Sequence, residues 1–195
     1  MQRSQCGQCG FVERQCVCRF IQQARVPQRV VIIQDIKESK HAKNTVGLLQ
    51  LAVPQTEVVG IHVDDDVSQC FDGLTAQNTA LIYPSACAEM IEPLENSDKF
   101  QIDNLVLIDA TWRRAKRIWL SNPSLQRLPA FTFREAPKSV YGVRKAPSIE
   151  SLSTFEASIY ALEQLNGINL RHIVGFMEAS LAWQWRDQPA EHKRG

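Results

Sequence analysis

The sequence predicts an α/β protein with a mostly parallel sheet, and three observations support this fold class. Short continuous runs of valine, isoleucine and leucine recur along the 195 residues, and such runs are typical of strands covered on both faces. Stretches with helical spacing of apolar residues fall between and after these runs. The hydrophobic fraction of 44% and the charged fraction of 22% are ordinary for a globular domain, and the length fits one domain with at most a small appendage.

The expected strands and helices alternate along the chain. Apolar runs predict strands over residues 30–33, 58–61, 80–83, 105–108 and 130–133. Helical patterns cover residues 44–52, 111–120, 153–166 and 172–185. The third helix has an apolar face at Phe155, Ile159 and Leu162, and Gly167 follows it as a stop signal.

Four of the six cysteines are clustered near the N-terminus, at Cys6, Cys9, Cys16 and Cys18. Zinc prefers four soft ligands at tetrahedral corners, and two short cysteine turns can supply two corners each. Gly10 permits the tight backbone that follows the first pair, whereas the second pair is closer than the usual C-x2-C spacing. We therefore expect a zinc-binding segment over residues 1–25 and a catalytic domain over 26–195, with a redox or reactive thiol cluster as the alternative.

Compartment and partners are indicated by what the sequence lacks. The N-terminus has no apolar run typical of a signal peptide, and no apolar stretch approaches transmembrane length. We expect a cytoplasmic protein without a membrane partner, in which the cysteines stay reduced. The formal net charge is only +1, so any affinity for nucleic acid must come from local clustering of basic residues.

Asp109 stands at the end of the apolar run 105–108, and a helical pattern begins within two residues. In open α/β sheets, ligands bind beyond the carboxyl ends of strands, which places Asp109 where chemistry usually occurs. Aspartate is also a favoured helix N-cap residue, so a capping role remains open.

Four of the five residues that follow Trp112 are basic: Arg113, Arg114, Lys116 and Arg117. Cations in the first turns of a helix oppose its dipole, so local stability does not explain them. Contact with nucleic-acid phosphates explains them better, although a solvated helix face is the alternative.

A resemblance to a known family rests on the segment Asp109-Ala110-Thr111-Trp112, which resembles the D-x-T-W signature of the DTW family. Four further segments resemble family motifs in the same order: Lys43-Asn44-Thr45, Tyr83-Pro84-Ser85, Tyr141-Gly142-Val143-Arg144-Lys145 and Leu152-Ser153-Thr154-Phe155-Glu156-Ala157. The match spans residues 6 to 160. One departure is Gln34-Asp35, where the family often has a His-Pro pair after the first strand, so no role is carried over to residues 34–38.

The resemblance implies a SPOUT-like fold with a C-terminal trefoil knot that binds S-adenosylmethionine (SAM). It also implies transfer of the 3-amino-3-carboxypropyl group of SAM to N3 of a tRNA uridine in the variable loop, which gives acp3U and releases S-methyl-5′-thioadenosine. The implied catalytic residues are Asp109, Thr111 and Trp112. The implied SAM-binding residues are Tyr83, Pro84, Ser85, Ile108, Asp109, Arg144, Ser153, Thr154 and Glu156. The implied tRNA-binding residues are Lys43, Arg113, Arg114, Lys116, Arg117 and Lys145.

The residue types suit this chemistry. A carboxylate at the edge of the site can accept the N3 proton of uridine, and Asp109 is the candidate base. Trp112 can stack on a base, or it can anchor its helix in the core. Ser153 and Glu156 have the spacing of a capping box, which explains both without a role in SAM binding.

Two other functions remain possible from the sequence. A SPOUT-type RNA methyltransferase uses the same donor, and a non-enzymatic zinc-containing RNA-binding protein accounts for the cysteines and the basic stretch. The released product distinguishes them, because a methyltransferase gives S-adenosylhomocysteine and a binding protein gives neither compound.

Overall fold

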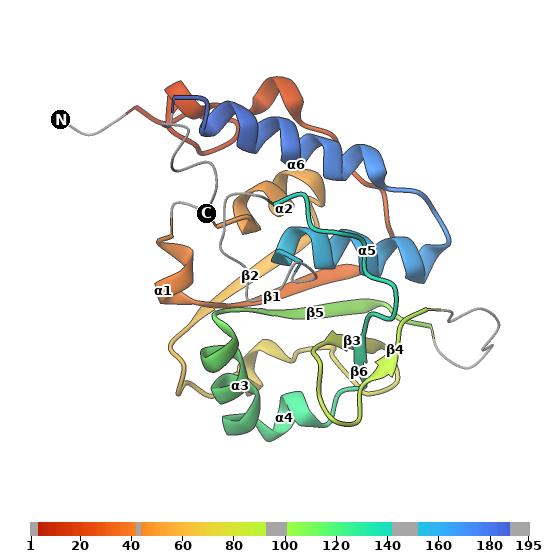
Figure 1. Cartoon of the computed structure of the whole chain (residues 1–195). Helices are drawn as coiled ribbons and strands as arrows, with labels where there is room; N and C mark the ends of the chain where they lie inside the picture. The colour runs from red at the N-terminus through yellow and green to blue at the C-terminus, as the bar shows by residue number, and fades with distance from the viewer. Residues whose placement is uncertain (1–3, 42–43, 93–100, 142–151, 188–195) are drawn as a thin grey trace.

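A single six-stranded sheet forms the centre of the molecule (Figure 1). The computed structural model describes residues 4–41, 44–92, 101–141 and 152–187. The strands are β1 (Arg29–Asp35), β2 (Thr56–Ile61), β3 (Thr79–Ile82), β4 (Glu89–Met90), β5 (Asn104–Asp109) and β6 (Ala130–Thr132). They pair in the order β2-β1-β5-β3-β6-β4, and every pairing within the sheet is parallel.

Helices cover both faces of this sheet. They are α1 (Ile36–Ser39), α2 (Val46–Ala52), α3 (Trp112–Ser121), α4 (Pro123–Gln126), α5 (Thr154–Asn166) and α6 (Arg171–Gln184). Three short 3-10 helices cover Glu13–Gln15, Cys18–Phe20 and Ser68–Cys70. In Figure 1, α2, α5 and α6 lie on one side of the sheet, and α3 and α4 lie on the other.

Strand β1 shows why the chain forms three layers. Its side chains alternate between the two faces, as the two-residue period of a strand requires. Val30 and Ile32 belong to the apolar core under α2, α5 and α6, whereas Val31 and Ile33 belong to the second core under α3 and α4. All four side chains are at most 1% exposed, so both faces of the strand are buried.

The predicted α/β class and parallel sheet are confirmed, and each expected strand and helix overlaps an observed one. Strand β4 and helices α1 and α4 were not expected, because elements of two to four residues carry no periodic signal. No helix in the described part of the chain has the length and apolar content needed to cross a bilayer.

The strand register brings two polar side chains together at the carboxyl edge of the sheet. Gln34 near the end of β1 lies opposite Asp109 at the end of β5. Ile82 of β3 lies opposite Leu107, so the segment after β3 continues along the same edge. This edge is where open α/β sheets bind their ligands.

Candidate active site and metal centre

The carboxylate of Asp109 is held by hydrogen bonds from three different parts of the chain. Its Oδ2 accepts hydrogen bonds from Gln34 Nε2 and Asn44 Nδ2, each at 2.8 Å. Its Oδ1 accepts a hydrogen bond from Thr154 Oγ1 at 2.5 Å. Asp109 is only 7% exposed, so these neutral donors replace most of the water that a carboxylate would otherwise bind.

The structure rules out the capping role considered for Asp109. Helix α3 has Thr111 as its N-cap, and the first backbone hydrogen bonds of the helix reach the carbonyl oxygen of Thr111. Asp109 lies two residues before this cap, and its side chain is directed to Gln34, Asn44 and Thr154.

A cavity of about 150 Å³ opens beside Asp109. Its walls are Glu38, His41, Asn44, Thr45, Asp109, Thr111, Tyr141, Ser153 and Thr154. They come from the segments after β1 and β5, the start of α2 and the start of α5. The cavity therefore has two carboxylates, one imidazole and several hydroxyl groups around one small volume, as a catalytic site requires.

A buried ion pair lies next to this cavity. Asp35, the last residue of β1, accepts hydrogen bonds from Nε and Nη2 of Arg114, the latter at 2.7 Å. The Asp35 side chain is 1% exposed and the Arg114 side chain 26% exposed. Burial is the largest single influence and raises the pKa of Asp35, but the hydrogen bonds from Arg114 and from the backbone N–H of Lys37, together with the positive charges of both residues, hold this pKa below its usual range. The pair ties α3 to β1.

Gln34, Asp35 and Asn44 are site residues to which the sequence alone assigned no role. Gln34 and Asp35 stand where the chain departs from the family pattern, so no role was carried over to them. Asn44 lies inside a segment that matches the family, and that match was the available signal for its importance. Each of the three contacts a residue far away in the sequence, which local patterns do not show.

The residues predicted to bind SAM fall into two groups. Ser153 and Thr154 line the cavity together with Asp109. The second group lies at the carboxyl edge of the sheet but does not line the cavity. It consists of Tyr83, Pro84 and Ser85, which follow β3, and Ile108 near the end of β5. Tyr83 is 8% exposed, stacks on Trp119 with ring centroids 5.2 Å apart, and has a pKa raised by burial. Arg144 lies outside the described residues.

Glu156 does not line the cavity, and it anchors the start of α5. Its carboxylate accepts hydrogen bonds from Ser153 N at 2.8 Å, from Val140 N at 2.8 Å, and from the hydroxyl groups of Ser139 and Ser153. The capping box expected from Ser153 and Glu156 is therefore confirmed. It also fixes the segment that leads to Tyr141 in the cavity wall.

Trp112 is 55% exposed at the first position of α3. The alternative that it anchors the helix in the core is therefore wrong. It directly follows Thr111, which lies in the cavity wall, and its side chain is exposed to solvent.

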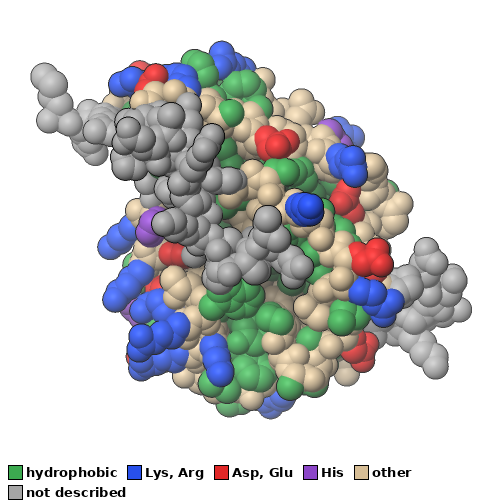
Figure 2. All heavy atoms as spheres, viewed as in Figure 1, with side chains coloured by type: hydrophobic (Ala, Val, Ile, Leu, Met, Phe, Trp, Pro, Cys, Tyr) green, Lys and Arg blue, Asp and Glu red, His purple; other side chains and the backbone are tan. Residues whose placement is uncertain are grey.

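The predicted tRNA-binding cations differ in their surroundings. Arg113 and Lys116 are exposed, Arg114 pairs with Asp35, and Arg117 forms two hydrogen bonds of 2.8 Å with Asp64. Lys and Arg side chains gather over α1 and α3 in Figure 2. Lys43 and Lys145 lie outside the described residues.

The four N-terminal cysteines converge on one point. Their Sγ atoms all lie within 4.8 Å of one another. Sγ of Cys6 is 3.5 Å from that of Cys16 and 3.6 Å from that of Cys18, and Cys9 and Cys16 are separated by 3.8 Å. Tetrahedral zinc with Zn–S bonds of about 2.3 Å places its sulfur ligands about 3.8 Å apart. The cluster therefore fits a metal ion of this kind, including the narrow Cys16–Cys18 pair.

The local electrostatics favour a metal in this cluster. Backbone N–H groups of Cys9 and Gln8 lower the pKa of Cys6 to about 6, which favours the metal-binding thiolate. The hydrogen bond with Cys16 raises the pKa of Cys18 to about 12. Gly10, with φ of 72°, makes the tight turn expected after Cys9. Four sulfurs this close ionise together only if a cation compensates their charge.

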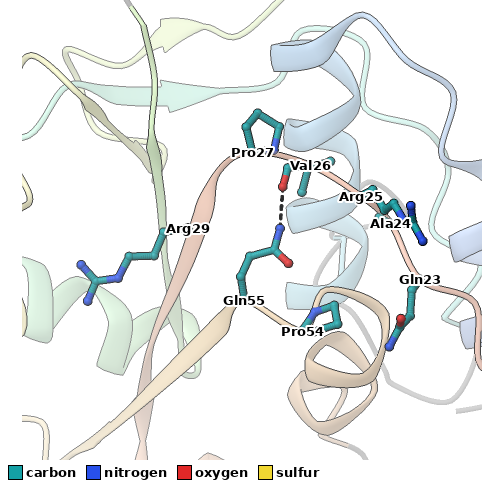
Figure 3. Close-up of a pocket in the computed structure, with 8 residues that line it drawn as sticks. All are labelled: Gln23, Ala24, Arg25, Val26, Pro27, Arg29, Pro54 and Gln55. Carbon is teal, nitrogen blue, oxygen red and sulfur yellow. Dashed lines mark hydrogen bonds between the residues drawn. The ribbon is translucent and has the colours of Figure 1, made fainter.

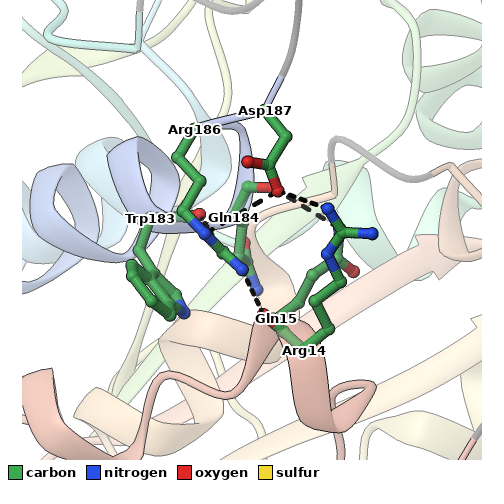
Figure 4. A network of polar contacts seen from close by, with 6 residues as sticks. All are labelled: Arg14, Gln15, Trp183, Gln184, Arg186 and Asp187. Carbon is green, nitrogen blue, oxygen red and sulfur yellow. Dashed lines mark hydrogen bonds and ion pairs between the residues drawn. The ribbon is translucent and has the colours of Figure 1, made fainter.

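The cysteine segment packs against the end of α6 (Figure 4). Arg14 forms an ion pair of 2.8 Å with Asp187, and Arg186 donates a hydrogen bond to the carbonyl oxygen of Arg14 at 3.0 Å. The guanidinium groups of Arg19 and Arg186 lie 3.8 Å and 3.6 Å from the ring of Trp183. The segment that carries the cysteine cluster is therefore attached to the C-terminal end of α6.

A second, larger hollow of about 420 Å³ lies at the opposite edge of the sheet (Figure 3). It is lined by the segment before β1 and the segment before β2, where Gln55 Nε2 donates a hydrogen bond to the carbonyl oxygen of Val26 at 2.8 Å. Its charged lining residues are Arg25 and Arg29, and the latter is paired with Glu57. The described residues around this hollow include no group suited to acid–base chemistry, so the smaller cavity is the candidate active site.

Comparisons with known proteins identify a family model and relatives that match most of this chain. The family model described as the DTW domain matches residues 3–182. tRNA-uridine aminocarboxypropyltransferase 2 of Mus musculus is 29% identical over 178 residues, which cover 86% of this chain and 58% of the mouse protein. The protein of the same name from Drosophila melanogaster is 30% identical over 173 residues, which cover 84% of this chain and 67% of the fly protein.

The chain thus spans 58% of the length of the mouse relative. No solved structure matches it significantly. Because the DTW model extends over nearly all of the chain, and its signature acid stands at the carboxyl edge of the sheet, this protein belongs to the DTW domain family.

Proposed function

We propose that this protein is a tRNA-uridine aminocarboxypropyltransferase that uses SAM as donor. The observation that carries the proposal is the position of Asp109. The aspartate of the DTW signature is fixed by three donors in the wall of a polar cavity, at the edge of the sheet where ligands bind. The matching names of the mouse and fly relatives support the same activity.

The proposed reaction joins N3 of uridine to the γ-carbon of the methionine arm of SAM. The N3–C bond forms as the C–S bond breaks, the sulfur keeps the electron pair and leaves in S-methyl-5′-thioadenosine, and the N3 proton passes to a base. Asp109 is the proposed base, since a partly desolvated carboxylate in the cavity wall can reach a proton there. Thr111 and the exposed ring of Trp112 are proposed to orient the uridine.

SAM binding is assigned to the same edge of the sheet. Ser153 and Thr154 line the cavity, and the segment after β3 lies beside Ile108. The other proposed contacts are Tyr83, Pro84, Ser85, Arg144 and Glu156. We further infer a SPOUT-like fold with a C-terminal trefoil knot. The parallel sheet with helices on both faces supports this arrangement.

The tRNA is proposed to lie across α3. Arg113 and Lys116 are exposed, and the basic side chains over α1 and α3 extend this surface (Figure 2). Lys43, Arg114, Arg117 and Lys145 complete the proposed set. The bond between Arg117 and Asp64 is solvent-exposed on both sides, at 62% each, so exchanging it for a phosphate costs little.

Zinc is the proposed occupant of the Cys6, Cys9, Cys16 and Cys18 cluster, with a structural role in the segment over residues 1–25. The distances between sulfurs and the thiolate character of Cys6 support it. A cytoplasmic location belongs to the same proposal, since a reduced cysteine cluster of this kind is typical of that compartment.

The experiment that tests the proposed function is incubation with SAM and unmodified tRNA, followed by nucleoside mass analysis. A uridine heavier by one aminocarboxypropyl group supports the proposal. A methylated nucleoside would instead indicate a SPOUT-type methyltransferase. Tight tRNA binding with no change in any nucleoside would indicate a non-enzymatic RNA-binding protein.

A further inference from the structure

We propose that Gln34 and Asn44 are positioning residues that fix the carboxylate of Asp109, an inference that rests on the proposed transfer reaction. The two side chains donate to the same oxygen, Oδ2, each at 2.8 Å. Gln34 comes from β1, and Asn44 comes from the segment before α2. We call this arrangement the amide clamp.

The amide clamp determines which oxygen of Asp109 is free to react. An ionised carboxylate offers about four acceptor positions, two on each oxygen. The amide clamp fills both positions on Oδ2, and Thr154 fills one on Oδ1 at 2.5 Å. Among the described residues, the acceptor position without a partner belongs to Oδ1. One defined lone pair is therefore left for a proton from a bound substrate.

The chain itself determines which way the two amides face. The Oδ1 atom of Asn44 accepts a hydrogen bond from Val46 N at 2.8 Å, so its Nδ2 is the atom directed to Asp109. Gln34 is 6% exposed and does not line the cavity. Because a carboxylate only accepts hydrogen bonds, the amide nitrogen of Gln34 must face it. Gln34 thus acts on the reaction through Asp109 and not by touching the substrate.

Amide-to-acid substitutions test the clamp with almost no change in shape. Asn44→Asp keeps the oxygen that Val46 N requires but turns a donor toward Asp109 into an acceptor. Gln34→Glu does the same from β1. Gln77→Glu is the matched control, since Gln77 is exposed in the turn before β3 at the opposite edge of the sheet.

In Gln34→Glu and Asn44→Asp, the single-turnover rate at saturating SAM and tRNA is expected to fall by about tenfold or more, because a misplaced catalytic group loses rate steeply. In Gln34→Glu the dissociation constant for SAM is expected to change by less than about threefold, since Gln34 does not line the cavity. Gln34→His retains an N–H donor at a similar reach and is expected to recover most of the rate, whereas Gln34→Met has the same length but no donor and is expected not to.

Two results would overturn the clamp: a wild-type rate in folded Gln34→Met and Asn44→Asp, or an equal loss in Gln34→Met and Gln34→His. If the proposed function is wrong, the wild-type protein itself makes no modified nucleoside, so this outcome is distinguished from failure of the clamp. The clamp is then tested by a double-mutant cycle of Gln34→Met and Asp109→Ala in urea, because each of these substitutions removes one partner of the hydrogen bond. A coupling of about tenfold in the unfolding equilibrium constant is expected for a hydrogen bond to a charged group, and a coupling below about twofold overturns the clamp.

Discussion

At the scale of single residues, Asp109 combines burial with three neutral hydrogen-bond donors. The acid is 7% exposed, yet its three partners are two amides and a hydroxyl group and not a cation. The nearby cation, Arg114, is instead paired with Asp35. Among the described residues, Asp109 therefore has no counter-ion. A carboxylate in this setting is suited to accept a proton or to bind a positively charged group.

Substitution of Asp109 separates catalysis from structure. In Asp109→Asn, the side-chain oxygen can still accept from Gln34 and Asn44, and the new amide can donate to the hydroxyl oxygen of Thr154. We expect a fold and affinities close to wild type but a single-turnover rate lower by about 10²–10⁴-fold, the usual contribution of a general base. Asp109→Ala leaves the three donors from Gln34, Asn44 and Thr154 without this acceptor and should cost about 1–3 kcal/mol of stability. A single-turnover rate near wild type in Asp109→Asn would remove Asp109 from the chemistry.

Residues of the site differ in how far they were predictable from the sequence. Asp109 was identified because an apolar run, an acid and a helix start form a local pattern. Gln34 and Asn44 are 75 and 65 residues away from it, and only the order and register of the strands bring them together. That information is not contained in local periodicity. The sequence pattern also did not show whether Trp112 is buried or exposed, and the structure shows that it is exposed.

At the scale of elements, the four cations of α3 differ in their surroundings. Arg114 binds the buried Asp35, while Arg113 and Lys116 are exposed. We expect Arg113→Glu and Lys116→Glu to weaken tRNA binding and to reduce the slope of log affinity against log salt by about one for each phosphate that is no longer bound. Arg171→Glu on α6 is the control, since it is exposed on the layer across the sheet. Equal weakening in all three variants would assign tRNA binding to overall charge and not to α3.

The proposed zinc is expected to hold the cysteine segment in its folded form. Purified protein is expected to contain about one zinc per chain. Cys6→Ser should lose the metal and release the segment from α6, which a change in the fluorescence of Trp183 would report because Arg19 and Arg186 flank its ring. Cys87→Ser, an exposed cysteine outside the cluster, is the control. Metal-free protein with native Trp183 fluorescence would show that the segment folds without zinc.

At the scale of the whole molecule, the sheet could be predicted as parallel but its strand order could not. Runs such as Val30–Ile33 and Leu105–Ile108 indicate strands buried on both faces, and both are central in the sheet. Strand β4 has two residues and both are exposed, so it carries no hydrophobic signal at all. The adjacency of β1 and β5, on which the site depends, follows from a crossover that no local pattern encodes.

The stability of the whole molecule should fall in acid. Arg29 lowers the pKa of Glu57 by a hydrogen bond, and Arg114 lowers the pKa of Asp35 despite its burial. A carboxyl group with a lower pKa in the folded state stabilises the fold above its unfolded pKa, and this contribution is lost as the pH falls through the folded pKa. The melting temperature should therefore be nearly constant above about pH 5 and drop below about pH 4. In Asp35→Asn this drop should be shallower, and an unchanged slope would exclude Asp35 as a source.

The proposed enzyme transfers the methionine arm of SAM, and not its methyl group, to tRNA. The most direct test of this transfer uses two preparations of SAM, one labelled in the carboxyl carbon of the methionine arm and one labelled in the methyl group. With wild-type protein and unmodified tRNA, we expect the carboxyl label to enter the RNA and the methyl label to leave in S-methyl-5′-thioadenosine. Asp109→Asn should transfer neither label at a comparable rate. Methyl label in the tRNA, with the carboxyl label in S-adenosylhomocysteine, would contradict the proposed reaction.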